Sequence, residues 1–333
     1  MMKKTTISKT MSYAPVEKVV NRLSKTSRTP KPPVLHRLVR DMTSEAYHGC
    51  QGTWSSSQLK DIIDDEEIFI KKYIKKEVPR EDRESFGTGT YFHTKVLEPH
   101  KVATEIAIFQ GKTRYGKAWD EFKAKSADKT VITEKQKSEG DAMAEAVHNS
   151  PICSEYIEGD PEISLFTKLV VAYGNIYAPE FKKVLTPNGW ESYKGSSIKG
   201  FEIIIKVRAD CLGEGFVSDL KSTSGRANNA HSVRGSISKY KYDLSAALYL
   251  DMFSLVKDVD SFIWIFASKE NPIATSWIAT ENQIKVGRAK WSWALKRIAD
   301  LAQANWEIVD YLREAEPLQH ELEWLKQRDI DLL

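Results

Sequence analysis

One segment with the pattern of a β-hairpin constrains the fold of this chain more than any other feature. Residues 203–210 (IIIKVRAD) and 216–223 (FVSDLKST) are rich in β-branched and apolar residues, and a turn with two glycines separates them at residues 213–215. Such runs on either side of a glycine-containing turn are typical of two antiparallel strands. Because side chains alternate along a strand, each strand presents its residues to two different faces of the sheet.

The charged residues of this segment point to chemistry. The hairpin would bring Asp210 near Asp219 and Lys221, with the last two on one face and Leu220 on the other. Two carboxylates and a lysine that converge can hold Mg²⁺ or Mn²⁺ beside a water molecule, with the Leu220 carbonyl as a further ligand. Lys221 would then orient or deprotonate the attacking water, as phosphodiester hydrolysis requires. The alternative is a surface ion pair between Asp219 and Lys221.

Composition narrows the class of protein. The 333 residues are 41% hydrophobic and 29% charged, which is ordinary for a globular protein. We expect no membrane segment and no signal peptide, because no apolar run approaches about 20 residues. Cys50, Cys153 and Cys211 are far apart and lack C-x-x-C spacing, so we expect neither a disulfide framework nor an iron–sulfur cluster. These features together favour a cytoplasmic protein.

The charge is unevenly distributed along the chain. Residues 1–40 carry ten Lys or Arg and one acid, although the net charge of the whole chain is only +3. We therefore expect a basic, largely irregular arm at residues 1–45, which either contacts phosphates or is a solvated leader. Residues 46–333 would form a single domain, with an acidic tail at about 313–333.

Periodicity predicts an α/β or α+β architecture, in which helices flank a small central mixed sheet. Serines 55–57 would cap a helix that an acidic run at 64–67 can break, and Thr133 and Thr280 have capping-box spacing. We expect helices at about 55–76, 86–98, 114–126, 133–148, 233–257 and 280–312, and further strands at 162–171, 261–268 and 274–279.

For several other residues, the sequence allows both a functional and a structural interpretation. His93 would be a metal ligand if its helix packs against the hairpin, and a structural histidine otherwise. Tyr242 and Tyr249 share one helix face, where they would either stack on bases or pack in the core. Lys239 and the loop residue Arg226 are candidate phosphate contacts, or simply solvated side chains.

Taken in order, several of these motifs resemble the PD-(D/E)XK nucleases, and most closely the exodeoxyribonuclease VIII branch of phage recombination exonucleases. The resemblance covers about residues 52–312 and rests on Gly89-x-x-x-His93, Asp210, Asp219-Leu220-Lys221 and the segment from Tyr242 to Asp251. It implies a restriction-endonuclease-like core. It also implies that His93, Asp210 and Asp219 bind metal and that Lys221 is the catalytic lysine, with Glu162 as a further acidic contributor.

The chain departs from this family in one motif. The family's Q-x-x-x-Y reads Ser245-x-x-x-Tyr249 here, so the glutamine that helps to position substrate phosphate is replaced by a shorter serine. The stretch at about 168–200 also resembles an insertion, and the basic arm is not a family feature.

The resemblance implies an Mg²⁺- or Mn²⁺-dependent DNA exonuclease that resects duplex ends in phage recombination or replication. A single-strand annealing protein would be its partner, a toroidal homo-oligomer its assembly and the bacterial host cytoplasm its location. Two alternatives stay open. One is a single-strand or structure-specific endonuclease of the same fold, and the other is a non-catalytic DNA- or partner-binding protein on a nuclease scaffold.

Overall fold

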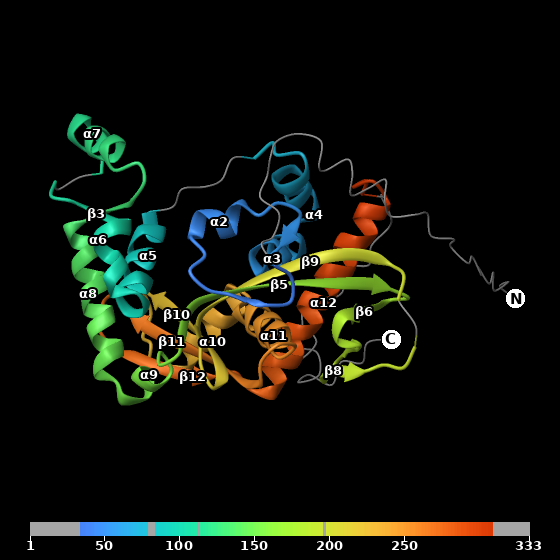
Figure 1. Ribbon diagram of the computed structural model, residues 1–333. Helices are drawn as coiled ribbons and strands as arrows, with labels where there is room; N and C mark the ends of the chain where they lie inside the picture. Colours follow the sequence, from blue (N-terminus) through green and yellow to red (C-terminus); the bar gives the residue numbers. More distant parts are fainter. Residues whose placement is uncertain (1–33, 79–83, 112–113, 196–197, 309–333) are drawn as a thin grey trace, which may run out of the picture.

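A mixed β-sheet organises the computed structural model, which describes residues 34–78, 84–111, 114–195 and 198–308. Within these residues the sheet has ten strands, in the order β12-β11-β10-β9-β5-β6-β7-β8, with β1 paired to β5 and β2 to β9 (Figure 1). Strand β10 runs parallel to β11, whereas β9 is antiparallel to both β5 and β10. The strands are β1 Leu38–Val39, β2 Thr53–Trp54, β5 Asp160–Ala172, β6 Asn175–Ala178, β7 Lys183–Thr186, β8 Gly189–Ser192, β9 Phe201–Leu212, β10 Gly215–Thr223, β11 Val259–Ser268 and β12 Ala274–Ile278.

Helices cover both faces of the sheet. Figure 1 shows α7 projecting at one end of the molecule, beside a separate two-stranded sheet of β3 (Ile106–Phe109) and β4 (Thr130–Thr133). The helices are α2 Ser44–Gly49, α3 Ser56–Asp64, α4 Glu66–Phe69, a π-helix Ile70–Ile74, α5 Glu84–Leu97, α6 Val102–Glu105, α7 Lys117–Lys125, α8 Glu134–Asn149, α9 Pro151–Glu155, α10 Ala230–Lys239, α11 Tyr242–Phe253 and α12 Glu281–Gln303, with 3₁₀ turns at Pro99–Lys101 and Pro179–Phe181.

Side chains of β11 point alternately to the two faces of the sheet and contribute to two hydrophobic cores. Trp264 and Phe266 belong to the larger core, to which α3, α11 and α12 contribute. Ile263 and Ile265 point to a second core, which Phe92 of α5 and residues of α8 complete. The sheet is therefore buried on both faces here, as expected where a parallel strand pair lies under helices.

Several local predictions are confirmed. Side-chain capping boxes begin α3 at Ser55, α8 at Thr133 and α12 at Thr280. The predicted break in the first helix falls at Asp65, which has an extended backbone and caps α4 with its carboxylate. The hairpin of β9 and β10 and the strands β5, β11 and β12 also lie where the sequence predicts them.

Other predictions are wrong in extent. The single helix expected over 233–257 is two helices, because the backbone is left-handed at Lys241, where φ is +48°. The Lys241 ammonium pairs with Asp64 of α3. The helix expected to reach residue 312 ends at Gln303. Within the arm that was expected to be largely irregular, the described residues 34–45 contain the two-residue strand β1, which pairs with β5, and the start of α2 at Ser44. The rest of the basic arm and the acidic tail lie outside the described residues.

The sheet is larger than predicted because the stretch at 168–200 extends it as β6, β7 and β8. A buried ion pair attaches this extension to the helical layer. Arg288 of α12 donates to both carboxylate oxygens of Asp251 at 2.9 and 2.7 Å, and also to the Pro187 carbonyl at 2.8 Å. The Trp190 indole donates to the Asp251 carbonyl at 2.7 Å. The described residues contain no helix that is both long and apolar enough to cross a membrane.

Candidate active site

The predicted hairpin opens into a fork. Strands β9 and β10 pair only at Val217 with Leu212 and at Ser218 with Cys211. Past these pairs the Asp210 side chain enters the opening, and its Oδ2 accepts a hydrogen bond from the Leu220 amide at 2.7 Å. A side chain thus replaces the backbone ladder at the point where the chemistry-bearing residues meet.

Three potential metal ligands converge on this fork. His93 of α5, Glu162 of β5 and Asp210 of β9 each offer one ligand atom, and these atoms lie within 4.8 Å of one another. The His93 Nδ1 is 3.3 Å from Asp210 Oδ2. Helix α5 does pack against the hairpin, since Phe92 contacts the same core as Leu220. The structure therefore meets the condition under which His93 becomes a candidate ligand.

Glu162 has an unusual backbone. Its φ of +53° is a left-handed conformation near the start of β5, where the neighbouring pairs are Pro161 with Cys211 and Ile163 with Ala209. Such a conformation costs on the order of 1 kcal/mol or more for a residue other than glycine, and it is often found at functional sites. The side chain meets Arg208 at 2.9 Å and joins the cluster with Asp210.

The acids at the fork are electrostatically crowded. Burial and the Asp210 charge raise the pKa of Glu162 to about 8, although Arg208 opposes this shift. Burial also raises the pKa of Asp210 to about 6, with His93 lowering it and Asp219 raising it. A cation between these groups would offset both the cost of burying the charged carboxylates and the repulsion between them. Hard carboxylate oxygens and one imidazole are a donor set that suits Mg²⁺ or Mn²⁺, so the residues present fit such an ion.

Asp219 and Lys221 form a buried ion pair on the next strand. Leu220 points the opposite way, into the core with Phe92 and Ile263, so the predicted division of faces is confirmed. The Lys221 ammonium also lies 3.3 Å from the Leu220 carbonyl. Burial alone would lower the pKa of Lys221, but Asp219 and Asp210 raise it above its ordinary value. Lys221 is therefore an ammonium at neutral pH.

Helix α11 forms a wall beside this pair. The Tyr242 ring centroid lies 5.0 Å from the Lys221 Nζ. Tyr249 bonds to Ser56, and burial raises its pKa to about 12. Ser245 is only 6% exposed, so it offers little surface to a substrate. Arg226 and Lys239 are exposed on the loop after β10 and at the end of α10, and Lys239 lies over the Tyr240 ring rather than at the fork.

Sequence reasoning missed two basic residues near the fork. Arg208 precedes Asp210 by two positions and hence shares its strand face, which was a usable signal. It bonds to Glu162 and to the Met42 carbonyl. Lys60 of α3 lies beside Tyr242, with its Nζ 5.3 Å from the ring centroid. No local pattern marks Lys60, because its position depends on how α3 packs against α11.

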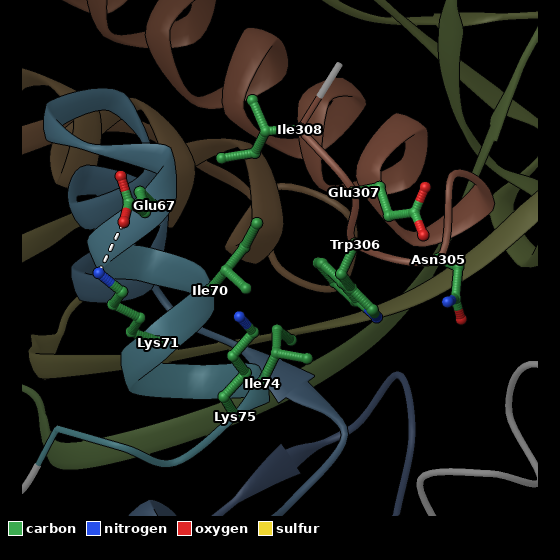
Figure 2. Close-up of a pocket in the computed structure, with 9 residues that line it drawn as sticks. All are labelled: Glu67, Ile70, Lys71, Ile74, Lys75, Asn305, Trp306, Glu307 and Ile308. Atoms are coloured by element: carbon green, nitrogen blue, oxygen red, sulfur yellow. Dashed lines mark hydrogen bonds and ion pairs between the residues drawn. The ribbon is translucent and has the colours of Figure 1, made fainter. Parts of the chain in front are cut away.

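The fork is distinct from a cavity of about 690 Å³ elsewhere in the molecule. Figure 2 shows that cavity between the π-helix and the end of α12, where Ile70, Ile74 and Trp306 line it beside the ion pair of Lys71 and Glu67. None of the predicted site residues lines it. The cavity therefore supplies no argument about the chemistry at the fork.

A known protein family matches the part of the chain that contains the hairpin of β9 and β10. Residues 181–312 match the model of a family described as a PDDEXK-like domain of unknown function. The fold is PD-(D/E)XK-like. The matched residues include Asp210, Asp219 and Lys221 and exclude His93 and Glu162. The PDDEXK-like description of this family agrees with the resemblance predicted from the motifs. The closer likeness to exodeoxyribonuclease VIII stays a prediction.

One solved structure extends the likeness to most of the chain. It is the crystal structure of a protein from Eubacterium rectale described as a "putative exonuclease", with a TM-score of 0.51 and 13% sequence identity. The match covers 85% of this chain and 98% of that one. At this identity the likeness concerns the fold alone. No curated protein matches the chain. Together, the PDDEXK-like family model and this neighbour support the same fold.

Proposed function

We propose that the chain is a metal-dependent deoxyribonuclease that hydrolyses phosphodiester bonds at the fork of β9 and β10. The observation that carries this proposal is the convergence of His93, Glu162 and Asp210 beside the ion pair of Asp219 and Lys221. These residues come from a helix, a separate strand and the hairpin of β9 and β10, and the helix and the separate strand are distant from the hairpin in the sequence. Three acids crowded beside a histidine and a buried lysine are electrostatically unfavourable, and such arrangements are typical of functional sites rather than of solvated surface clusters.

In this proposal His93, Glu162, Asp210, Asp219 and the Leu220 carbonyl hold Mg²⁺ or Mn²⁺. A bound cation supplies Lewis-acid stabilisation of charge on the phosphate oxygens and makes water a better nucleophile near neutral pH. Arg208 holds Glu162 in place through their 2.9 Å contact. The Leu220 amide holds Asp210 in the fork.

Lys221 acts as a hydrogen-bond donor. Its raised pKa keeps the ammonium charged, so it orients the attacking water and neutralises charge that develops on the phosphate. The Asp219 carboxylate fixes the direction of that ammonium through the ion pair. The partly exposed ring of Tyr242 borders the same space and is a candidate contact for the substrate. We assign Tyr249, Arg226 and Lys239 a supporting role in DNA binding, and Ser245 a packing role.

DNA is the substrate that the fold suggests, and we propose end-directed hydrolysis of duplex DNA in phage recombination or replication. This finer statement rests on the likeness of the motifs to exodeoxyribonuclease VIII. The annealing-protein partner and the toroidal assembly rest on the same likeness. A non-catalytic protein on this scaffold is the less favoured alternative, because a decayed site usually loses one of its charged residues and this one retains them.

The test is a time course on four DNA substrates with Mg²⁺ or Mn²⁺: blunt linear duplex, nicked circle, covalently closed circle and single strand. We expect degradation of the linear duplex and an intact closed circle. Cleavage of the closed circle would identify an endonuclease instead, and no cleavage of any substrate would exclude a nuclease. Asp219→Ala and Lys221→Ala should each lower the rate by about a thousandfold or more. Full activity in both variants would refute the assigned site.

A further inference from the structure

Two lysines approach one tyrosine ring beside the fork. The Lys60 Nζ of α3 lies 5.3 Å from the Tyr242 ring centroid, and the Lys221 Nζ of β10 lies 5.0 Å from the same centroid. Helices α3 and α11 belong to the larger core, whereas α5, which carries His93, packs on the second core. Lys60 therefore approaches the fork from the face of the sheet opposite to His93.

The two ammonium groups differ in their partners. Lys221 is paired with Asp219, but Lys60 has no carboxylate within 4.0 Å in the part of the chain that the structure describes. Nearby lysines behave differently, since Lys72 pairs with Asp61 and Lys241 with Asp64. Lys60 is thus a half-buried positive charge that lies over the aromatic face of Tyr242.

The surroundings make this charge costly. Burial and the Lys221 charge together lower the pKa of Lys60 to about 8, although Asp219 and Asp243 act in the opposite direction. If Lys60 had only a packing role, the protein would be more stable with a carboxylate paired to it or with an apolar residue in its place. An anion bound between Lys60 and Lys221 would offset both burial and repulsion.

We propose that Lys60, Tyr242 and Lys221 bind one phosphate group of the nucleic-acid backbone, with Lys60 as a substrate-binding residue. This inference rests on the proposed function, because it takes DNA as the substrate. A backbone phosphate is the anion that must approach the fork for hydrolysis, and the acids there repel it. Two ammonium groups and a phenol supply the positive charge and the hydrogen-bond donors that such a phosphate needs. Lys60 neither donates nor accepts a proton in the reaction.

The proposal is tested by DNA binding without cleavage. Wild type, Lys60→Ala, Lys60→Arg and Lys75→Ala are titrated against a fluorescein-labelled blunt duplex in EDTA, over a series of KCl concentrations. Lys75 is an exposed lysine of the neighbouring segment, so its variant loses the same charge away from the fork. We expect Lys60→Ala to weaken binding about five- to tenfold and to reduce the salt slope by about one. Lys60→Arg and Lys75→Ala should stay within about twofold of wild type.

Steady-state cleavage supplies a second readout. With Mg²⁺, Lys60→Ala should raise KM by a similar factor and change kcat less. Unchanged Kd, salt slope and KM in Lys60→Ala, or a loss of equal size in Lys75→Ala, would overturn the proposal. So would a wild type that does not bind the duplex.

The two proposals fail in different ways. A wild type that binds through Lys60 but cleaves no substrate would refute the nuclease activity and leave the phosphate site. A wild type that cleaves while Lys60→Ala is unaffected would refute only the phosphate site. Thermal melts confirm that each variant is folded, and Lys60→Met replaces Lys60→Ala if the alanine variant is unstable.

Discussion

The Leu220 amide donates a hydrogen bond to Asp210 Oδ2 at 2.7 Å, across the point where β9 and β10 separate. The same oxygen lies 3.3 Å from the His93 Nδ1. Asp210 therefore connects the backbone of one strand to a side chain of α5. The fork depends on this carboxylate, because β9 and β10 have only two ladder pairs before they diverge.

Asp210→Asn separates charge from hydrogen bonding. The amide oxygen of asparagine can still accept from Leu220, so we expect a fold close to that of wild type. The loss of a carboxylate should lower cleavage by about a thousandfold or more and weaken Mn²⁺ binding in calorimetry. Asp210→Ala should in addition lose about 1–3 kcal/mol of unfolding free energy, because the buried amide loses its partner. Equal stability in both variants would contradict the role of this hydrogen bond.

Asp219 and Lys221 should show strong coupling in stability. Lys221→Met leaves the Asp219 carboxylate, which is 6% exposed, without its ion partner. We expect a loss of about 3 kcal/mol in the free energy of unfolding at pH 7, measured in urea. The double variant Asp219→Asn/Lys221→Met should recover most of this loss while remaining inactive. If the two effects simply add, the buried pair is not coupled as the structure indicates.

The raised pKa of Glu162 predicts a pH-dependent stability in EDTA. The folded pKa is about 8, above the ordinary value of 4.5, because of burial and Asp210. The folded protein therefore holds a proton that the unfolded chain releases, and stability present at pH 4.5 is lost as the pH rises through 8. The loss should be on the order of 1 kcal/mol or more.

Glu162→Gln is the control for this effect. Its free energy of unfolding should change less between pH 5 and pH 9, because the group with the raised pKa is gone. Mn²⁺ should stabilise the wild type at pH 8 more than this variant. An identical pH profile in both proteins would show that Glu162 does not titrate in this range.

Lys60 should reduce stability while it promotes binding. Its pKa falls from 10.5 to about 8, so Lys60→Met should raise the free energy of unfolding at pH 7 by on the order of 1 kcal/mol. Between pH 8 and 10.5 the folded wild type loses a proton that the unfolded chain keeps. The stability of the wild type therefore rises, and the difference in unfolding free energy between wild type and Lys60→Met becomes smaller. Urea unfolding at pH 7 and pH 10 checks both statements. A destabilised Lys60→Met would indicate a structural lysine.

Breaking the ion pair of Arg288 and Asp251 should lower the stability of the fold without changing metal binding at the fork. Both residues are buried, and Arg288 also bonds to the Pro187 carbonyl of the β7–β8 connection. Arg288→Met should cost about 3–5 kcal/mol of unfolding free energy, because the Asp251 charge stays buried without its partner. Metal affinity of the folded variant should be unchanged. A reduced Mn²⁺ affinity would show that β6–β8 influence the fork.

The local elements were predictable because local interactions create them. The Ser55, Thr133 and Thr280 caps bond to residues three positions along the chain, so their helices begin where the sequence indicates. The break at Lys241 was not predictable in this way. Lys241 has a φ of +48° and its ammonium pairs with Asp64, 177 residues away in the chain, while the apolar pattern continues on both sides of the break.

The amino-acid sequence by itself determined the hairpin, the face that Asp219 shares with Lys221 and the likeness to PD-(D/E)XK nucleases, since alternation and short motifs are properties of neighbouring residues. Only the tertiary structure decided which residues meet at the fork. It placed Glu162 with His93 and Asp210, and it brought Lys60 to Tyr242. These relationships join elements separated by many residues, and packing of the two cores against one sheet sets their distances.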